Sequence, residues 1–166
     1  MSLERLWAGW RREYVGSVGA EVPGDDCVLC RVLADEGQVV WRGETTAAIV
    51  NAFPYTSGHL LVLPVRHVGE MEELSAEEGA ALWAAVTDAV RALKAAYRPD
   101  GLNVGVNLGR SAGAGIPGHF HLHVLPRWNG DTNFMTTVAE TRVVPEALDA
   151  TVDKLRAAWP DAASRT

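Results

Sequence analysis

The sequence of 166 residues predicts a single α+β domain, and three observations support that class. Short runs of β-branched and apolar residues recur along the chain and predict strands. One long segment after Ser75 carries apolar residues at three- and four-residue steps, which predicts one long helix between the strands. The length suits one domain with a substantial core. We expect residues 1–26 to form an N-terminal arm and loop, and residues 27–159 to form the core.

The first half of the core is expected to hold a short helix and three strands. Residues 27–36 are compatible with the short helix. Residues 39–41 and 47–51 are apolar and β-branched, and they predict two strands joined by a turn at Gly43. The segment 59–65 is almost wholly apolar, so we expect a third strand that is buried on both faces.

The second half is expected to hold the long helix, two strands and a terminal helix. Residues 75–78, Ser-Ala-Glu-Glu, form a capping box that predicts the start of the helix, and Arg-Pro-Asp-Gly at 98–101 ends it. Residues 102–108 and 119–125 predict the two further strands. Residues 145–159 predict a terminal amphipathic helix, because their apolar residues recur on one side.

Composition and charge point away from membranes and nucleic acids as partners. The net charge is −6 and the acidic residues are spread along the chain, so a broad basic surface for a polyanion is not expected. No apolar run reaches the length of a membrane span, and the first residues do not resemble a signal peptide. We therefore expect a cytoplasmic protein, in which an anionic ligand would need local hydrogen-bond donors.

Three histidines at alternate positions stand in the sequence GHFHLHVLPRW of residues 118–128. They are His119, His121 and His123. On a β-strand, alternate side chains project from one face, so the three imidazoles are expected to point the same way. Crowded imidazoles suit either a metal ion or chemistry on an anion. His59 and His67 flank the third predicted strand and could join them.

The two cysteines, Cys27 and Cys30, form a Cys-x-x-Cys pair. In a cytosolic protein this spacing favours metal or redox chemistry over a structural disulfide. With His67 and His119 they would supply two thiolates and two imidazoles, a set that suits tetrahedral Zn²⁺. A closed site of this kind leaves no position for substrate, so the zinc would be structural. The alternative is two reduced, buried cysteines without a metal.

These motifs resemble the histidine triad (HIT) nucleotide-binding family. The resemblance is carried by residues 119–128 and by residues 57–67, which are similar to the family's upstream block. Residues 6–11 and 128–134 resemble a bacterial subgroup that includes diadenosine tetraphosphate phosphorylases. The resemblance covers most of residues 3–159. It implies a five-stranded antiparallel sheet with one long helix and a C-terminal helix, in proteins that usually pair as dimers.

The resemblance implies that the middle histidine, His121, forms a covalent nucleotidyl-histidine. An unprotonated imidazole nitrogen can attack phosphorus, and a hydrogen bond from the other nitrogen would fix the tautomer. His123 and His59 are expected to hydrogen-bond phosphate or leaving-group oxygens. The same resemblance, at all four positions, supports zinc on Cys27, Cys30, His67 and His119.

Further residues are expected to bind the nucleotide. By the resemblance, Asn51 binds the ribose hydroxyls and Asn107 contacts sugar or phosphate, although each could equally be a turn-forming Asn. Apolar residues that correspond to the base-binding positions, with ordinary core packing as the alternative, are Val28, Leu29 and Ile49.

The segment before the triad departs from the family pattern. Family members often carry a Gln or a hydroxyl residue two to four positions before the first triad histidine, where this chain has Gly115, Ile116 and Pro117. We expect the backbone of Gly115 and Ile116, or the nearby Ser111, to serve instead, because glycines allow close backbone approach to phosphate. Arg66, Arg110 and Arg127 could meet a distal phosphate or remain surface charges.

The leading functional hypothesis is an enzyme that cleaves dinucleoside polyphosphates such as diadenosine tetraphosphate through His121, with phosphate or water as the acceptor. Mg²⁺ is a second candidate cation, accompanying the substrate. The alternatives are a nucleoside phosphoramidate hydrolase, a non-catalytic nucleotide-binding protein, and a metalloenzyme with all three triad histidines on one ion. A homodimer or higher assembly is expected, with the aromatic N-terminal arm docked on its own sheet or across the dimer.

Overall fold

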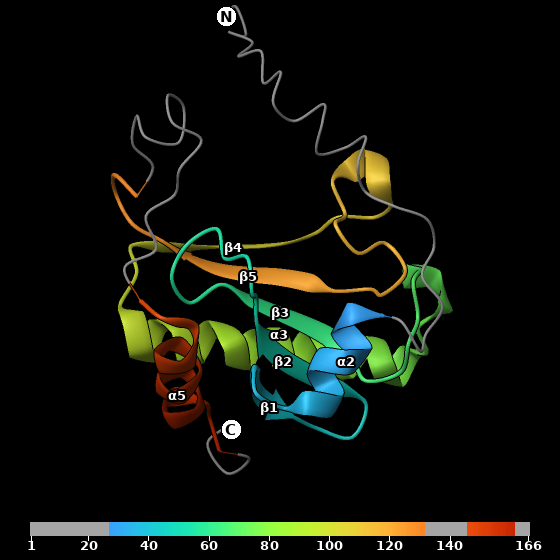
Figure 1. Cartoon of the computed structure of the whole chain (residues 1–166), viewed down its shortest axis with the longest axis horizontal. Coiled ribbons are helices and arrows are strands. Elements are labelled where there is room, and N and C mark those ends of the chain that lie inside the picture. The colour runs from blue at the N-terminus through green and yellow to red at the C-terminus, as the bar shows by residue number, and fades with distance from the viewer. Residues whose placement is uncertain (1–26, 132–145, 162–166) are drawn as a thin grey trace, which may run out of the picture.

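A five-stranded antiparallel sheet, with strand order β1-β2-β3-β5-β4, forms the centre of the computed structural model. The structure describes residues 27–131 and 146–161 (Figure 1). The α+β class and the antiparallel sheet of five strands are both confirmed. The strands are β1 (Val39–Arg42), β2 (Thr46–Val50), β3 (Leu60–Pro64), β4 (Gly101–Val106) and β5 (Leu122–Arg127).

The long helix α3 (Ala76–Tyr97) begins at the capping box that the sequence predicts. The hydroxyl of Ser75 accepts a hydrogen bond from the backbone N–H of Glu78 at 3.1 Å, and the Glu78 carboxylate accepts one from the N–H of Ser75 at 2.9 Å. The helix ends at Arg98, whose φ of 46° is left-handed. These local hydrogen bonds satisfy backbone groups that a bare helix end would leave unpaired.

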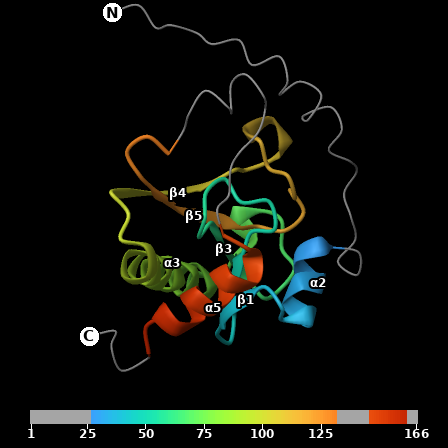
Figure 2. The same cartoon turned by 60° about the vertical axis from the view of Figure 1, so that its left-hand side comes forward.

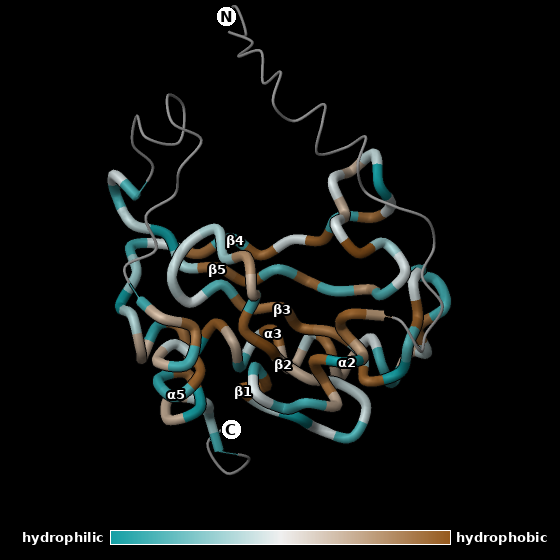
Figure 3. Tube along the Cα trace, in the orientation of Figure 1, coloured by the Kyte–Doolittle hydropathy of each residue, from teal (hydrophilic) through white to brown (hydrophobic). Residues whose placement is uncertain are grey.

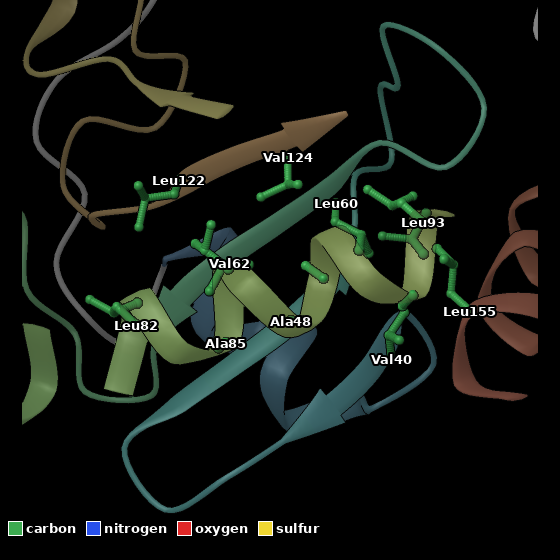
Figure 4. Close-up of a cluster of buried hydrophobic side chains, with 14 of the residues drawn as sticks. Val40, Ala48, Leu60, Val62, Leu82, Ala85, Leu93, Leu122, Val124 and Leu155 are labelled. Atoms are coloured by element: carbon green, nitrogen blue, oxygen red, sulfur yellow. The ribbon is translucent and has the colours of Figure 1, made fainter. Parts of the chain in front are cut away.

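One face of the sheet is covered by α3 and by the terminal helix α5 (Leu148–Ala158). Leu82, Ala85 and Leu93 of α3 lie over β3 and β5, and Leu155 of α5 closes one end of this core (Figure 4). Burial of these apolar side chains is the main force that holds the helices on the sheet, at about 25 cal/mol per Å² of apolar surface.

The opposite face is partly covered by the short helix α2 (Val28–Asp35), which lies across the sheet from α3 and α5 (Figure 2). Leu29 and Leu33 of α2 pack against Ile49, Leu61 and other alternate strand residues. Strand β3 is therefore buried on both faces, as its sequence predicts, and apolar residues concentrate along β2 and β3 (Figure 3).

The triad strand is displaced from its predicted range. It was expected at residues 119–125, but β5 begins at Leu122. The preceding residues leave the ladder because the N–H of Phe120 donates to the carbonyl of Val68 at 2.7 Å, which joins them to the loop after β3. The structure also contains two short 3₁₀ helices that the sequence pattern does not predict, η2 (Met71–Glu73) and η3 (Arg110–Ala112).

The N-terminal arm lies outside the described residues, and so do the last three residues, 132–134, of the segment 128–134. Within the described ranges, no helix combines the length and apolar character that a bilayer crossing requires.

Candidate active site and metal centre

Two cysteines and two histidines converge beside the amino end of α2. The ligand atoms of Cys27, Cys30, His67 and His119 all lie within 4.8 Å of one another. Nδ1 of His119 is 3.5 Å from each Sγ, and Nδ1 of His67 is 3.4 Å from Sγ of Cys30. In tetrahedral zinc geometry, usual bond lengths place sulfur and nitrogen ligands about 3.6 Å apart. The four residues can therefore hold a metal ion with little rearrangement.

Three separate segments of the chain supply the members of this metal centre. Cys27 is the N-cap of α2 and Cys30 lies in its first turn, while His67 follows β3 and His119 precedes β5. Nε2 of His119 donates to the carbonyl of Pro64 at 2.9 Å, which turns the lone pair of Nδ1 toward the thiols. Burial lowers the pKa of His119 to about 4, so its imidazole is neutral, the form that binds metals.

A second histidine group, which we call the catalytic group, consists of His59, His121 and His123. The rings of His121 and His123 lie 5.1 Å apart, and so do those of His59 and His123. The register of β3 with β5 brings them together, because Leu61 pairs with His123 and His59 lies two residues before Leu61 on the same face. The structure therefore separates His119 from the other triad histidines and gives no support to one metal ion on all three.

His121 is held in the tautomer that a nucleophile requires. Its Nδ1 donates to the backbone carbonyl of His119 at 2.7 Å, so the proton resides on Nδ1 and Nε2 keeps its lone pair. Burial lowers the pKa of His121, while this hydrogen bond opposes the shift. His121 is 7% exposed, so Nε2 is little solvated. Such a nitrogen can attack an electrophilic phosphorus atom.

His59 and His123 form a directed hydrogen-bonded pair. The backbone N–H of Tyr55 donates to Nδ1 of His59 at 3.1 Å, so His59 carries its proton on Nε2. That Nε2 lies 2.9 Å from Nδ1 of His123 and donates to it. His123 must then carry its own proton on Nε2. Burial above all lowers the pKa of His123 to about 4, so neutral His123 offers one N–H donor beside His121.

Tyr55 was missed by the sequence reasoning. Its ring centroid is 4.5 Å from that of His59, and it stacks on His123 at 5.8 Å with an interplanar angle of 18°. A tyrosine in the loop between β2 and β3 carries no sequence signal for such a role. Gly58 is also required here, because its φ is 82° and a Cβ atom would lie 2.9 Å from the Tyr97 ring.

The two candidate asparagines, Asn51 and Asn107, both hydrogen-bond within the chain. Oδ1 of Asn51 accepts from the N–H of Phe53 at 3.0 Å, and its Nδ2 lies 3.3 Å from Nδ1 of His59. Nδ2 of Asn107 donates to the carbonyl of Gly113 at 3.4 Å. Both side chains thus hydrogen-bond to backbone groups of the loops that follow β2 and β4.

The expected base-binding residues are not all on an open surface. Leu29 and Ile49 are 3% and 1% exposed and belong to the core under α2, whereas Val28 is 41% exposed. Gly115 is exposed in the loop before the triad, and Ile116 is half-buried against the same core. Of the three apolar residues, only Val28 offers a side chain to a ligand in this arrangement.

Arg66 and Arg127, two of the candidate phosphate ligands, are bound to carboxylates. Arg66 contacts Glu78 through Nε and Nη2, both at 2.9 Å, and Arg127 contacts Asp131 through Nε at 2.6 Å and Nη2 at 2.7 Å. Such bidentate pairs leave little positive charge for phosphate. Arg110 lies in η3, in the loop that precedes the triad.

The fold and the two histidine groups define a class of protein, an α+β domain that places a buried imidazole with a free Nε2 beside a group that could hold a metal ion. A protein-family model described as "HIT domain" matches residues 34–130. The chain is 40% identical over 165 residues to a protein named AP-4-A phosphorylase from Mycobacterium tuberculosis (strain CDC 1551 / Oshkosh), covering 95% of this chain and 85% of that protein. The chain belongs to the HIT family, as the motifs predict.

Solved structures agree with this assignment. A Zn-bound histidine triad family protein from Mycobacterium smegmatis is 29% identical, with a TM-score of 0.68 over 81% of this chain and 94% of that chain. A hypothetical histidine triad nucleotide-binding protein from Sulfolobus tokodaii strain7 is 30% identical, with a TM-score of 0.67 over 80% of this chain and 91% of that one. The predicted HIT fold is thereby confirmed.

Proposed function

We propose that this protein cleaves dinucleoside polyphosphates such as diadenosine tetraphosphate through a covalent nucleotidyl-His121 and transfers the nucleotidyl group to inorganic phosphate. The observation that carries the proposal is the 2.7 Å hydrogen bond from Nδ1 of His121 to the carbonyl of His119, which leaves Nε2 free to attack. The choice of substrate and acceptor is supported by the name of the M. tuberculosis relative.

The proposed reaction has two displacements at phosphorus. In the first, Nε2 of His121 forms a bond to an α-phosphorus of diadenosine tetraphosphate, and the bond from that phosphorus to the bridging oxygen breaks, which releases ATP. The Nε2–H of His123 hydrogen-bonds an oxygen of the reacting phosphate or leaving group. In the second, a phosphate oxygen attacks the same phosphorus, the P–N bond breaks, and ADP forms with free His121.

We propose that the metal centre holds Zn²⁺, bound by Cys27, Cys30, His67 and His119. The donor set and the spacing of its atoms fit zinc, and the M. smegmatis structure has zinc bound. Bound there, zinc would join three segments of the chain and supply no open coordination position to substrate. Mg²⁺ enters the proposal only as an ion carried by the polyphosphate.

Incubation with diadenosine tetraphosphate, with and without phosphate, tests this function. We expect equal amounts of ADP and ATP when phosphate is present, and no such products without it. AMP and ATP in the absence of phosphate would instead indicate water as the acceptor. Release of AMP only from adenosine phosphoramidate would favour the phosphoramidate hydrolase, and nucleotide binding without turnover would favour a pure binding protein.

We propose a cytoplasmic homodimer, or a higher assembly built from it, because HIT proteins usually pair. Sedimentation of the full chain with and without nucleotide tests the assembly.

A further inference from the structure

His119 is fixed through both of its ring nitrogens, and its backbone carbonyl holds the nucleophile. Nδ1 lies 3.5 Å from the sulfur atoms of Cys27 and Cys30, and Nε2 donates to the carbonyl of Pro64 at 2.9 Å. The carbonyl oxygen of His119 accepts the 2.7 Å hydrogen bond from His121. His119 is fully buried. Its side chain belongs to the metal centre, and its backbone carbonyl contacts the catalytic group.

The β-sheet does not supply this anchoring. Leu122 is the first residue of β5 to pair with its neighbouring strands, so His119 and His121 both precede the ladder. A glycine-rich loop precedes them in turn. Between loop and ladder, the N–H of Phe120 donates to the carbonyl of Val68. The N–H of His119 donates to the carbonyl of Ile116 at 3.4 Å, and the side-chain contacts of His119 further constrain where its own carbonyl lies.

We propose that the metal centre positions the nucleophile, with His119 as the positioning residue. Metal binding at Nδ1 of His119 holds its carbonyl where it accepts the proton of Nδ1 of His121. Nε2 of His121 then remains the unprotonated nitrogen and keeps its direction into the site. The catalytic consequence rests on the proposed function, whereas the effect on the His121 tautomer does not.

Three variants separate positioning from simple stabilisation. His67→Ala removes a metal ligand that touches neither His121 nor the remaining catalytic group. His67→Cys offers a thiolate in its place, and metal analysis shows whether the ion is retained. Leu33→Ala is the matched control, because Leu33 is buried under α2 and binds no metal, so it lowers stability without changing the ligand set.

Two readouts are measured on each full-length variant and related to its metal content. The first is the tautomer of His121, from two-dimensional ¹H–¹⁵N spectra of the imidazole ring. The second is the rate of nucleotidyl-His121 formation in a single turnover, measured beside the Kd for nucleotide. We expect metal-free His67→Ala to show a mixture of His121 tautomers and adduct formation about tenfold slower, as befits the loss of one hydrogen bond, with Kd little changed. Leu33→Ala, and His67→Cys if it keeps the metal, should match wild type.

A folded, metal-free His67→Ala that keeps the Nδ1–H tautomer and the wild-type adduct rate would overturn the proposal. If that variant does not fold, zinc is exchanged for Cd²⁺ in the wild-type chain, which lengthens the bonds to the ligands. The ¹⁵N shifts of His121 should then move, and unchanged shifts would overturn the proposal as well. If wild type forms no adduct with any nucleotide, the proposed function fails. The His121 tautomer, compared between metal-bound and metal-free protein, then decides whether the metal centre positions His121.

Discussion

The chemistry of the site depends on where each imidazole keeps its proton. In the catalytic group, backbone partners make that choice: the His119 carbonyl holds the proton of His121 on Nδ1, and the N–H of Tyr55 directs the proton of His59 to Nε2. His123 receives its tautomer from His59. A lone pair on His121 and an N–H on His123 are thus adjacent, which is the arrangement that attack on a phosphate needs.

Removing the donor should impair the enzyme less than removing the nucleophile. His123→Ala is expected to lower kcat about 10²–10³-fold, the usual effect of losing one transition-state hydrogen-bond donor. The adduct should still form, because His121 remains. Rapid-quench kinetics measure both quantities. A loss of less than about threefold would exclude His123 from the transition state.

The pH dependence follows from the lowered pKa values. Protonated His123 would have to direct its Nδ1–H against the Nε2–H of His59, so the neutral form is the active one. Because burial lowers the pKa of His123 to about 4, the neutral form persists as the pH falls and is lost only near that value. We expect kcat/KM to stay nearly constant down to about pH 5.5, where an imidazole of ordinary pKa would already be mostly charged. A decline of kcat/KM centred near pH 6.5 would contradict the lowered pKa of His123.

The single residues that the sequence predicts least well are those whose partners come from distant segments. Alternation placed all three triad histidines on one face, yet His119 lies with two cysteines some 90 positions away in the chain. The Cys-x-x-Cys motif and the family resemblance recovered that partnership, which periodicity alone could not. Likewise, the aligned apolar positions did not decide between base binding and core packing for Leu29 and Ile49, which are buried between α2 and the sheet.

At the level of elements, local signals predict well and tertiary contacts modify the result. The capping box alone gives the start of α3, and a run of apolar residues gives the doubly buried β3, because both depend on nearby residues. The start of β5 was predicted three residues too early, since the hydrogen bond from Phe120 to Val68 is a long-range contact with no local signature. Helix α2 is short, and Cys27 and Cys30 at its amino end link it to His67 and His119 beside the sheet.

Loss of the metal should therefore weaken the attachment of α2. We expect one zinc per chain in wild type and none in Cys27→Ser, with Tm lower by more than about 10 °C, because metal-binding energy contributes directly to folding. The catalytic rate of the protein that remains folded should fall much less than it does for a catalytic-group variant. Metal analysis and thermal unfolding of tag-free protein test this. Wild-type protein that contains no metal would remove the zinc site.

The whole molecule presents one face of its sheet to the helices α3 and α5 and shares the other between α2 and the catalytic group. We propose that residues 27–159 form the folding core and that the preceding arm acts in assembly. The arm lies outside the described residues, so this proposal rests on its sequence, in which Trp7 and Trp10 are three positions apart and would share a face of one helical turn.

Deletion of residues 1–14 should weaken assembly, raise KM, or do both. Large aromatic side chains each bury on the order of 150–250 Å², enough to matter at an interface. Sedimentation and steady-state kinetics of the truncated protein provide the measurement. An unchanged oligomeric state together with unchanged kinetics would show that the arm is dispensable.

The covalent intermediate is the most direct test of the account. Wild-type protein quenched during turnover of diadenosine tetraphosphate should carry an acid-labile nucleotidyl group, and peptide mass spectrometry should place it on His121. His121→Asn should bind nucleotide, carry no such group, and turn over more than about a thousandfold more slowly. An adduct on another residue, or a His121→Asn protein that keeps about a tenth of the wild-type rate, would contradict the assignment of His121 as the nucleophile.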